Sequence, residues 1–316
     1  METSVIVCAY TEDRWMELGT CITSLQKQTH PADEIIIVID HNDALLERSK
    51  RVWPNLTIIP NYFKQGLSGA RNSGIGIASG EIIFFIDEDA YASANWLKIL
   101  LDSYVDPDVI GAGGAIIPNW EKSPPSWFPG EFNWVVGCTY IGLPENPQPV
   151  RNLIGCNMSY RREAFELAGL FRNGIGRIGT TPLGCEETEL CIRISHTLPH
   201  KRLMYIPAAQ VFHFVPTQRK SLQYFRQRCF AEGLSKAAIS YFIGHQDAVS
   251  TEQTYVRKVL LRGVVNGLIG FIKQTEKAGL SKAASIIFGL CTTVSGYIWG
   301  NISQLYAQRS LALERK

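Results

Sequence analysis

Several signatures that identify common classes of enzyme are missing from this 316-residue sequence. Its first apolar run is not followed by Gly-x-Gly-x-x-Gly, and no Gly-Lys-Ser/Thr loop occurs, which argues against dinucleotide binding and against a Walker-type phosphate site. No Ser-His-Asp or Cys-His signature points to a covalent nucleophile. The eight cysteines form no Cys-x-x-Cys pair, and no histidine has the spacing of a zinc partner, so we expect reduced, mostly buried thiols.

Charged residues are also scarce, at 19% of the chain. The length suits one enzyme-sized domain with an appendage. The N-terminus has no basic segment, long apolar stretch or cleavage site, and we therefore expect the catalytic part to stay in the cytoplasm. Basic charge collects in residues 217–277, which contain ten Lys or Arg and four Asp or Glu. This segment is either a solvated helical surface or a site for anionic headgroups or phosphates. Nucleic acid is not an expected partner, because no recognised nucleic-acid module is present.

Four apolar runs have the composition of buried parallel strands. Residues 5–10, 34–40, 56–60 and 81–87 are rich in β-branched residues and alternate with helix-like stretches. This β-α-β-α-β order predicts a doubly wound sheet. Three of the runs end in polar residues, and ligands bind outside the carboxyl ends of such strands. The sequence therefore predicts one site that collects Tyr10-Thr11, Asp40 and Asp87-Glu88-Asp89.

The acidic triplet is the first candidate for chemistry. Asp87 and Asp89, separated by one residue, can both reach a hard divalent cation such as Mg²⁺ or Mn²⁺. Taken alone, an acidic triplet at a strand end is more typical of a turn or a helix cap. The preceding residues 66–74 favour the metal, because small residues allow close packing and Arg71 offers a forked cation for a phosphate. On its own that segment also fits an ordinary glycine-rich helix start.

Two further segments carry groups suited to proton transfer or metal binding. Residues 184–190 contain three glutamates at a predicted helix start, where acidic residues also favour the helix dipole. A carboxylate is the expected group for taking a hydroxyl proton, and Glu186 and Glu187 are both candidates. His213 lies in an apolar run, where a core histidine is the ordinary interpretation and a nitrogen ligand that completes a metal shell is the alternative.

Taken in order, these segments resemble the family 2 glycosyltransferases of the GT-A fold, which are inverting enzymes that use nucleotide-diphosphate sugars. The resemblance spans residues 3–235 and rests on the strand ends at Tyr10-Thr11 and Asp40, residues 66–72, 87–89, 155–159 and 186–190, and His213. It implies a Rossmann-like α/β fold with a mixed central sheet and a C-terminal helical tail. The expected catalytic domain is 1–235, with a nucleotide-sugar half at 1–110 and an acceptor half at 111–235. Residues 236–316 would form a helical, membrane-associated region.

The resemblance also implies roles for the motif residues. Glu187 stands where the family usually has the Asp of a Glu-Asp pair and is the expected base, with Glu186 as the alternative. The implied cofactor is Mn²⁺ or Mg²⁺, with ligands Asp89, Asp87 and His213. Glu88 would line the nucleotide-sugar site between the two aspartates without binding the metal. The implied nucleotide-sugar contacts are Ala9, Tyr10, Thr11, Asp40, Arg71, Asp87 and Glu88, with uridine as the default base because it is the family's commonest.

The second half of the chain has the composition of an acceptor site. After residue 110 the sequence becomes rich in glycine, proline and tryptophan, which suggests loops and mixed strands around a second subsite. Residues 120–134 and 155–162 resemble, more specifically, family members that act on lipid-phosphate-linked sugars. The expected acceptor contacts are Trp120, Asn157 and Met158. The implied activity is transfer of a hexose to a hydroxyl of a lipid-linked sugar or a growing glycan.

The tail contains a long uncharged run. Residues 283–308 contain no Asp, Glu, Lys or Arg, which exceeds the roughly 18 residues of a spanning helix, but polar and small residues make the run weakly hydrophobic. Basic residues precede it at Arg257, Lys258, Arg262, Lys273 and Lys277. An interfacial or spanning helix is favoured over a soluble core helix. We expect the enzyme at the inner face of the cell membrane, either peripheral or anchored by its C-terminus.

Two other functional classes fit the same fold. The first is a catalytically silent sugar- or nucleotide-binding protein, although the acids at 87, 89, 186 and 187 argue for activity. The second is a nucleotidyltransferase, which would carry a glycine-rich loop with Lys or Arg after the first strand. This chain has Tyr10-Thr11-Glu12-Asp13 there. A glycosyltransferase releases a nucleoside diphosphate from a nucleotide sugar, a nucleotidyltransferase releases pyrophosphate, and a silent binding protein releases neither.

Overall fold

In the computed structural model, which describes residues 1–172, 184–243 and 254–314, nine strands form one mixed sheet. The strand order is β3-β2-β1-β4-β8-β6-β9-β5, and β7 pairs with β9 off this path. The strands are β1 (Thr3–Ala9), β2 (Glu34–Ile39), β3 (Thr57–Pro60), β4 (Ile82–Asp87), β5 (Ala90–Ala92), β6 (Val109–Trp120), β7 (Gln148–Pro149), β8 (Asn157–Arg161) and β9 (Arg202–Val215).

The first half of the sheet is parallel and doubly wound, as predicted. β1 pairs in parallel with β2 and β4, and β2 pairs in parallel with β3. The strands are apolar on both faces because helices cover both: Val5 and Val7 belong to the core under α1, whereas Ile6 and Cys8 belong to the core under α3. The helical elements of this half are η1 (Glu12–Arg14), α1 (Trp15–Gln26), α2 (Asp43–Val52), α3 (Leu67–Ile77) and α4 (Trp96–Ser103).

The second half of the sheet mixes strand directions. β8 runs antiparallel to β4 and to β6, and β6 runs parallel to β9 with two register shifts. β5 pairs antiparallel with β9, so that Ala90 lies opposite His213. The expected mixed central sheet is therefore confirmed. The helical elements of this half are η2 (Gly130–Val136), α5 (Arg162–Ala168) and α6 (Glu186–Thr197).

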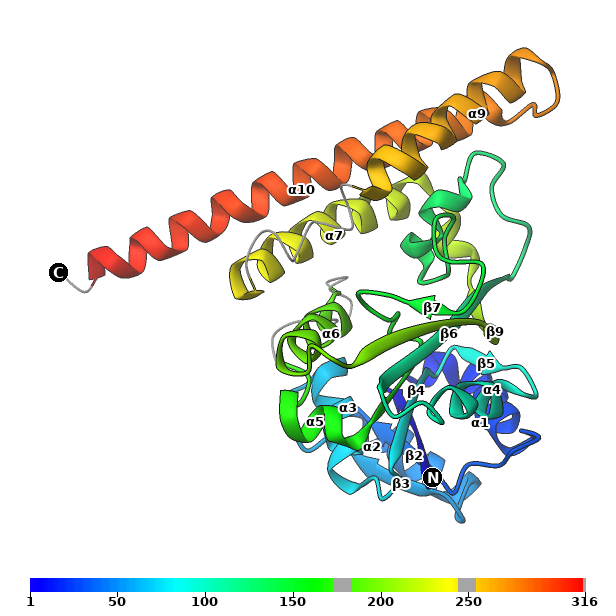
Figure 1. Ribbon diagram of the computed structural model, residues 1–316, viewed down its shortest axis with the longest axis vertical. Helices are drawn as coiled ribbons and strands as arrows, with labels where there is room; N and C mark the ends of the chain where they lie inside the picture. Colours follow the sequence, from blue (N-terminus) through cyan, green and yellow to red (C-terminus); the bar gives the residue numbers. More distant parts are fainter. Residues whose placement is uncertain (173–183, 244–253, 315–316) are drawn as a thin grey trace.

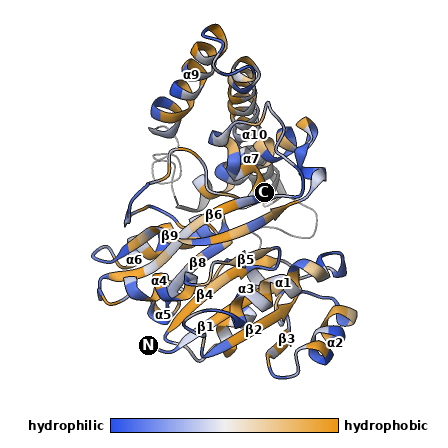
Figure 2. Cartoon of the chain, turned by 90° about the vertical axis from the view of Figure 1, so that its right-hand side faces the viewer, coloured by the Kyte–Doolittle hydropathy of each residue, from blue (hydrophilic) through white to orange (hydrophobic). Residues whose placement is uncertain are grey.

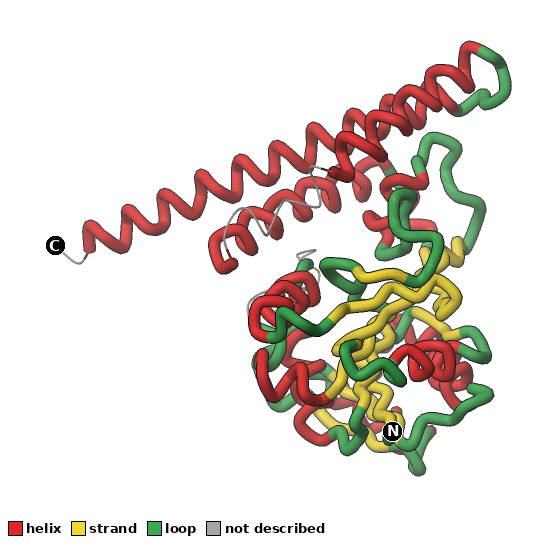
Figure 3. The backbone as a smooth tube through the Cα atoms, viewed as in Figure 1, coloured by secondary structure: helices red, strands yellow, loops and turns green. Residues whose placement is uncertain are grey.

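The C-terminal region forms a helical layer beyond the β6–β9 side of the sheet (Figures 1 and 3). α9 and α10 make a hairpin, and α10 continues alongside α7 (Figure 1). The division expected at residue 235 falls inside α7, which continues past it without a break. The elements are η3 (Thr217–Lys220), α7 (Leu222–Ile243), the π-helical turn η4 (Val256–Leu260), α9 (Leu261–Ile272) and α10 (Gly279–Glu314).

Glycines allow α10 to pack closely on α7. A Cβ atom on Gly233 would collide with the carbonyl oxygen of Thr293, and one on Gly296 would collide with the carbonyl oxygen of Phe230. Backbones that approach this closely exclude a larger side chain at either position. The middle of the uncharged run therefore lies against protein along one side.

One segment of the described residues, Gly279–Ser303, is long and apolar enough to cross a membrane, with a mean hydropathy of 1.3. A third of its most apolar stretch is buried inside the protein. Both helices of the α9–α10 hairpin carry many apolar residues, seen as orange bands (Figure 2), and several of them are exposed. The exposed apolar residues include Leu261, Val265, Ile269, Ile272, Ile287, Val294, Ile298 and Trp299.

All eight cysteines are free, and seven of them are buried, as expected. The exposed one, Cys291, lies on α10.

Candidate active site

The carboxyl ends of the parallel strands open into a cavity of about 710 Å³. The strand ends reach it through Tyr10, Asp40 and the triplet at 87–89, so the three predicted polar ends do meet. The opposite wall of the cavity, its roof, consists of residues from α7, η4 and α10 together with Tyr255. One cavity therefore joins the sheet to the helical layer.

Asp87, Asp89 and His213 form a cluster whose ligand atoms lie within 4.8 Å of one another. Asp87 ends β4, and Asp89 lies in the turn just before β5. Pairing of β5 with β9 brings His213 to the same point, with its Nε2 atom 3.2 Å from Asp89 Oδ1. Two carboxylates and an imidazole can hold a divalent cation, and carboxylate oxygens suit Mn²⁺ or Mg²⁺.

Asp89 is surrounded by cationic side chains. Arg14 Nη1 lies 3.1 Å and Arg219 Nη2 lies 3.4 Å from Asp89 Oδ2. Burial alone would raise the pKa of Asp89, but His213 and the two arginines outweigh it and hold that pKa well below its ordinary value. Asp89 is therefore ionised at neutral pH, which is the state that a metal ligand requires.

Glu88 turns toward Arg14 and not toward the three-residue cluster. Its Oε1 atom lies 2.6 Å from Arg14 Nη1. Burial raises the pKa of Glu88 to about 7, although Arg14 opposes the shift. Glu88 lines the cavity and fixes Arg14 beside Asp89.

Arg71 connects the acidic cluster to the start of α6. Its Nη1 atom lies 2.8 Å from Glu186 Oε1, and its Nη2 atom lies 3.5 Å from Asp87 Oδ1. A further hydrogen bond of 3.2 Å runs from Nη2 to the carbonyl oxygen of Gly155. The sequence predicts that Arg71 holds a phosphate; in the structure two carboxylates balance its charge, and it fixes Glu186.

Glu187 lies next to this ion pair and lines the cavity. Within the described part of the chain no cation pairs with it. Burial, followed by the neighbouring charge of Glu186, raises the pKa of Glu187 to about 8. A carboxyl group that titrates near neutral pH is suited to accept a proton from a hydroxyl. The geometry therefore favours Glu187 over Glu186 as a base.

The remaining residues of the first two strand ends have different surroundings. Ala9 and Tyr10 line the cavity. Asp40 also reaches it, but its carboxylate accepts hydrogen bonds from the Gly66 amide at 2.9 Å and from Asn61 Nδ2 at 2.6 Å. Thr11 is absent from the described cavity lining; its hydroxyl caps η1 by accepting the Asp13 amide at 3.2 Å.

The three expected acceptor contacts need correction. Asn157 is fully buried: its amide nitrogen donates to two backbone carbonyls, and its oxygen accepts the Trp96 indole N–H at 2.8 Å. Met158 is fully buried in the core on the other face of β8. Trp120 packs edge-on against Phe128, with ring centroids 5.4 Å apart, and is outside the described cavity lining. These side chains support the walls and do not face the cavity.

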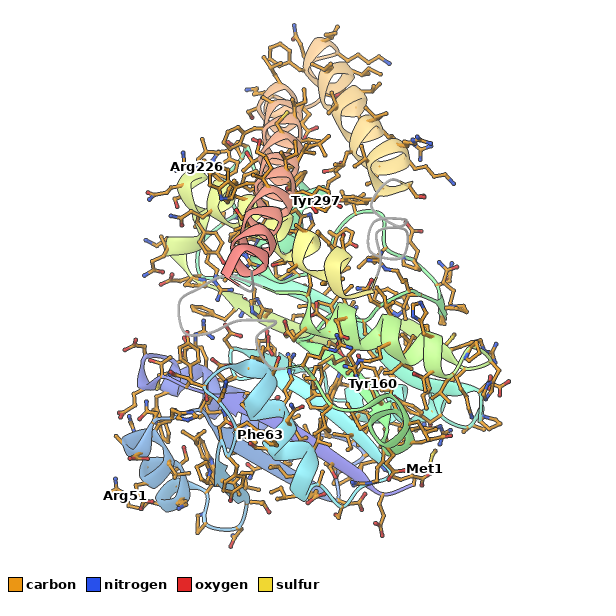
Figure 4. All side chains as sticks on the ribbon, turned by 90° about the vertical axis from the view of Figure 1, so that its left-hand side faces the viewer. Met1, Arg51, Phe63, Tyr160, Arg226 and Tyr297 are labelled. Carbon is orange, nitrogen blue, oxygen red and sulfur yellow. The ribbon has the colours of Figure 1, made fainter. Side chains whose placement is uncertain are left out.

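The roof supplies cavity residues that the motifs did not identify. Tyr224, Arg228, Glu232 and Lys236 are spaced four apart on α7, and all of them face the cavity. The same spacing is visible in the sequence, but a polar stripe on a helix ordinarily faces solvent. Tyr297, labelled in Figure 4, joins them from α10.

Comparison with known proteins identifies the fold and the class of enzyme. The model of glycosyl transferase family 2 matches residues 4–168, which is more than half of the chain. This chain belongs to that family. It is a glycosyltransferase, and the expected GT-A fold is confirmed by solved structures that share it.

Two of these structures show how far the fold extends. The mannosyltransferase PcManGT of Pyrobaculum calidifontis, solved with GDP-Man and Mn²⁺, matches 93% of this chain and 87% of its own with a TM-score of 0.57 and 14% identity. GalNAc-T7, solved with UDP, GalNAc and Mn²⁺, matches 74% of this chain with a TM-score of 0.52 and 18% identity. This chain corresponds to about half of GalNAc-T7, at 48% of that chain.

Curated relatives match over nearly the whole sequence. The glucosyl-dolichyl phosphate glucuronosyltransferase of Haloferax volcanii is 29% identical over 95% of this chain and 96% of its own length. The succinoglycan biosynthesis protein ExoM of Rhizobium meliloti is 24% identical over 88% of this chain and 96% of its own. The similarity thus includes the C-terminal helices.

Proposed function

We propose that this glycosyltransferase moves a sugar from a nucleotide-diphosphate sugar, with UDP as the default nucleotide, to a hydroxyl of a lipid-phosphate-linked sugar, and that the transfer inverts the anomeric carbon. The observation that carries the proposal is the joint presence of the Asp87–Asp89–His213 cluster and Glu187 in one cavity. A donor diphosphate and an acceptor hydroxyl require these two kinds of group.

The acidic cluster is suited to the diphosphate end of the donor. Asp87, Asp89 and His213 would hold Mn²⁺ or Mg²⁺, which when bound supplies positive charge for the departing nucleoside diphosphate. Arg14 and Arg219, both beside Asp89, are placed to add positive charge at the same end. Tyr10 and Asp40, at the neighbouring strand ends, would border the base and ribose.

Glu187 is suited to activate the acceptor. Its carboxylate would take the proton of the acceptor hydroxyl while that oxygen attacks the anomeric carbon from the face opposite the leaving group. Arg71 fixes the adjacent Glu186 and therefore holds the start of α6 in position. A single displacement of this kind needs no covalent enzyme intermediate and inverts the configuration.

The relative from Haloferax volcanii supports a lipid-linked acceptor, because its name says that it acts on glucosyl-dolichyl phosphate. Such an acceptor is also supported by the exposed apolar residues of the α9–α10 hairpin and the basic residues near them. Because α10 packs on α7, we infer that the hairpin lies in the interface of the membrane and does not cross the bilayer. We propose further that the catalytic domain faces the cytoplasm.

The activity is tested by incubating the protein with Mn²⁺, a panel of nucleotide sugars and a glycosyl phospholipid. We expect release of a nucleoside diphosphate in step with product. Near-normal transfer by Asp89→Ala or Glu187→Gln would contradict the proposed roles. Release of pyrophosphate would indicate a nucleotidyltransferase, and nucleotide binding without turnover would indicate a silent binding protein.

Membrane attachment is tested by flotation with vesicles that contain anionic lipids. Ile272, on α9, is 76% exposed, and Val105, between α4 and β6 of the catalytic domain, is 79% exposed. We expect the Ile272→Glu variant to lose vesicle binding and to be absent from the floating fraction, and the Val105→Glu variant to float with the vesicles as the unmodified protein does. Equal behaviour of the two variants, or no flotation of the unmodified protein, would contradict attachment through the hairpin.

A further inference from the structure

The roof of the cavity carries more positive than negative charge. Among its lining residues from α7, η4 and α10, three are cationic, namely Arg228, Lys236 and Arg257, and one is acidic, namely Glu232. Lys236 Nζ lies 3.6 Å from Glu232 Oε1, so these two charges largely offset each other. By formal charge, the lining residues of the roof therefore carry three positive charges and one negative charge, and Arg151 lines the cavity from the sheet domain.

Three acidic residues of the cavity pair with arginines outside the roof. Glu186 pairs with Arg71, while Glu88 and Asp89 pair with Arg14. The roof and the acidic cluster line the same cavity, and Glu232 of the roof reaches the start of α6, where its Oε1 atom accepts a hydrogen bond from Cys185 Sγ at 3.5 Å. A ligand with an anionic group is attracted to the roof, whereas a metal is attracted to the cluster.

An apolar surface lies directly beside the roof cations. Val256 and Leu260 of η4, with Leu290 and Val294 of α10, line the same cavity. Val294 is also 47% exposed, so this surface continues from the cavity to the outside of α10. Other exposed apolar residues of α10 extend it, including Ile287 and Ile298. Positive charge next to an apolar path that leads outward fits an amphiphile whose anionic group enters the cavity first.

We propose that the roof binds the acceptor through its phosphate at Arg228, Lys236 and Arg257, and binds the first carbons of its lipid chain along Val256, Leu260, Leu290 and Val294. This site rests on the proposed function and specifies which part of the protein recognises the acceptor. It replaces the expected contacts at Trp120, Asn157 and Met158. The lipid chain would continue along α10 toward the membrane.

A binding measurement with three probes tests this site. The probes are phytanyl phosphate, phytanol and inorganic phosphate, each titrated against the full chain and followed by intrinsic fluorescence. We expect tight binding of phytanyl phosphate only, because the site needs both the charge and the chain. Inorganic phosphate that binds as tightly as phytanyl phosphate would overturn the lipid part, and phytanol that binds as tightly would overturn the phosphate part.

Variants of the roof locate the binding. We expect Arg228→Gln/Lys236→Gln to weaken phytanyl phosphate binding by about tenfold or more, as loss of hydrogen bonds to a charged group predicts. Arg226, which is exposed on α7 and absent from the cavity lining, provides the matched control Arg226→Gln (Figure 4). Arg257 is exposed, so Arg257→Gln repeats the test at a position that does not disturb the core. Unchanged affinity in the roof variants, or an equal loss in Arg226→Gln, would overturn the site.

Nucleotide binding separates this inference from the proposed function. In the presence of Mn²⁺, we expect Arg228→Gln/Lys236→Gln to bind UDP within about twofold of the unmodified protein, since neither residue belongs to the Asp87–Asp89–His213 cluster. A protein that binds neither UDP nor any other nucleoside diphosphate contradicts the proposed function. If the affinity for phytanyl phosphate is the same in the roof variants as in the unmodified protein, only the roof site is contradicted.

Discussion

The two ends of the cavity are built in different ways. At the sheet end, pairing of β4 with β1 fixes Asp87, and pairing of β5 with β9 fixes His213. The Phe214 amide donates to the carbonyl oxygen of Asp89 at 2.8 Å, so backbone hydrogen bonds determine where these side chains lie. At the roof, side-chain packing of α7 against α10 determines the wall, with glycines at the contact. The first kind of construction suits a metal site, which tolerates little movement, and the second suits a surface that admits substrates of varied length.

Removal of the base should have the largest effect and should change catalysis without changing nucleotide binding. We expect Glu187→Gln to lower kcat by about 10³-fold, within the range for loss of a general base. The affinity for UDP with Mn²⁺ should change little, because Glu187 is outside the acidic cluster. Glu166→Gln, at an exposed position of α5, is the control. If kcat fell by less than tenfold, the base would have to be another group.

Removal of a ligand from the sheet end should affect the metal directly. We expect Asp89→Ala to weaken Mn²⁺ binding by more than about 100-fold, the upper value for loss of an outer-shell partner. The free Mn²⁺ concentration, followed by electron paramagnetic resonance, measures this without any assay of activity. Asp102→Ala, at an exposed residue of α4, serves as the matched control. Mn²⁺ affinity that survives Asp89→Ala would show that the cation is held elsewhere.

The pH dependence of transfer tests the surroundings of the base. Since burial raises the pKa of Glu187 to about 8, the active carboxylate form is lost as the pH falls. We expect kcat to drop about tenfold per pH unit below pH 8 and to level off above it. A profile that is flat from pH 6 to pH 9 would mean that Glu187 does not act as the base.

The smallest expected effect on chemistry comes from the roof packing. Gly233→Ala forces α7 away from Thr293 on α10 and should cost about 1–3 kcal/mol of stability, the range for overpacking. Gly19→Ala, where a Cβ meets open space in α1, should instead stabilise by up to about 1 kcal/mol. Urea denaturation measures both values. Equal changes in the two variants would contradict the close contact of α7 with α10.

The same contrast explains what could be predicted from the sequence. The strand ends at Tyr10, Asp40 and Asp87 were predictable because strand order alone brings carboxyl ends to one edge. The roof was not, since the contact between Gly233 and Thr293 joins positions about sixty residues apart without a motif. The face of the sheet toward which the side chain of a strand residue points could not be predicted either. Asn157 and Met158 stand in a family segment, yet both are buried on opposite faces of β8.

Arg71 illustrates a further limit. The sequence predicts a cation near the nucleotide here, and in the structure its Nη2 atom lies 3.5 Å from Asp87 Oδ1. Its ion pair with Glu186 joins α3 to the start of α6, residues more than a hundred positions apart, and no local pattern encodes that contact. That contact distinguishes Glu186, which is paired, from Glu187, which is not paired within the described residues.

The central claim is direct transfer with inversion by a cavity that holds donor and acceptor together. Proton NMR of a reaction between an α-linked nucleotide sugar, Mn²⁺ and a glycosyl phospholipid tests it most directly, because the coupling constant of the anomeric proton reports configuration. We expect a β-linked product from the first turnover, formed in step with nucleoside diphosphate. An α-linked product would contradict it.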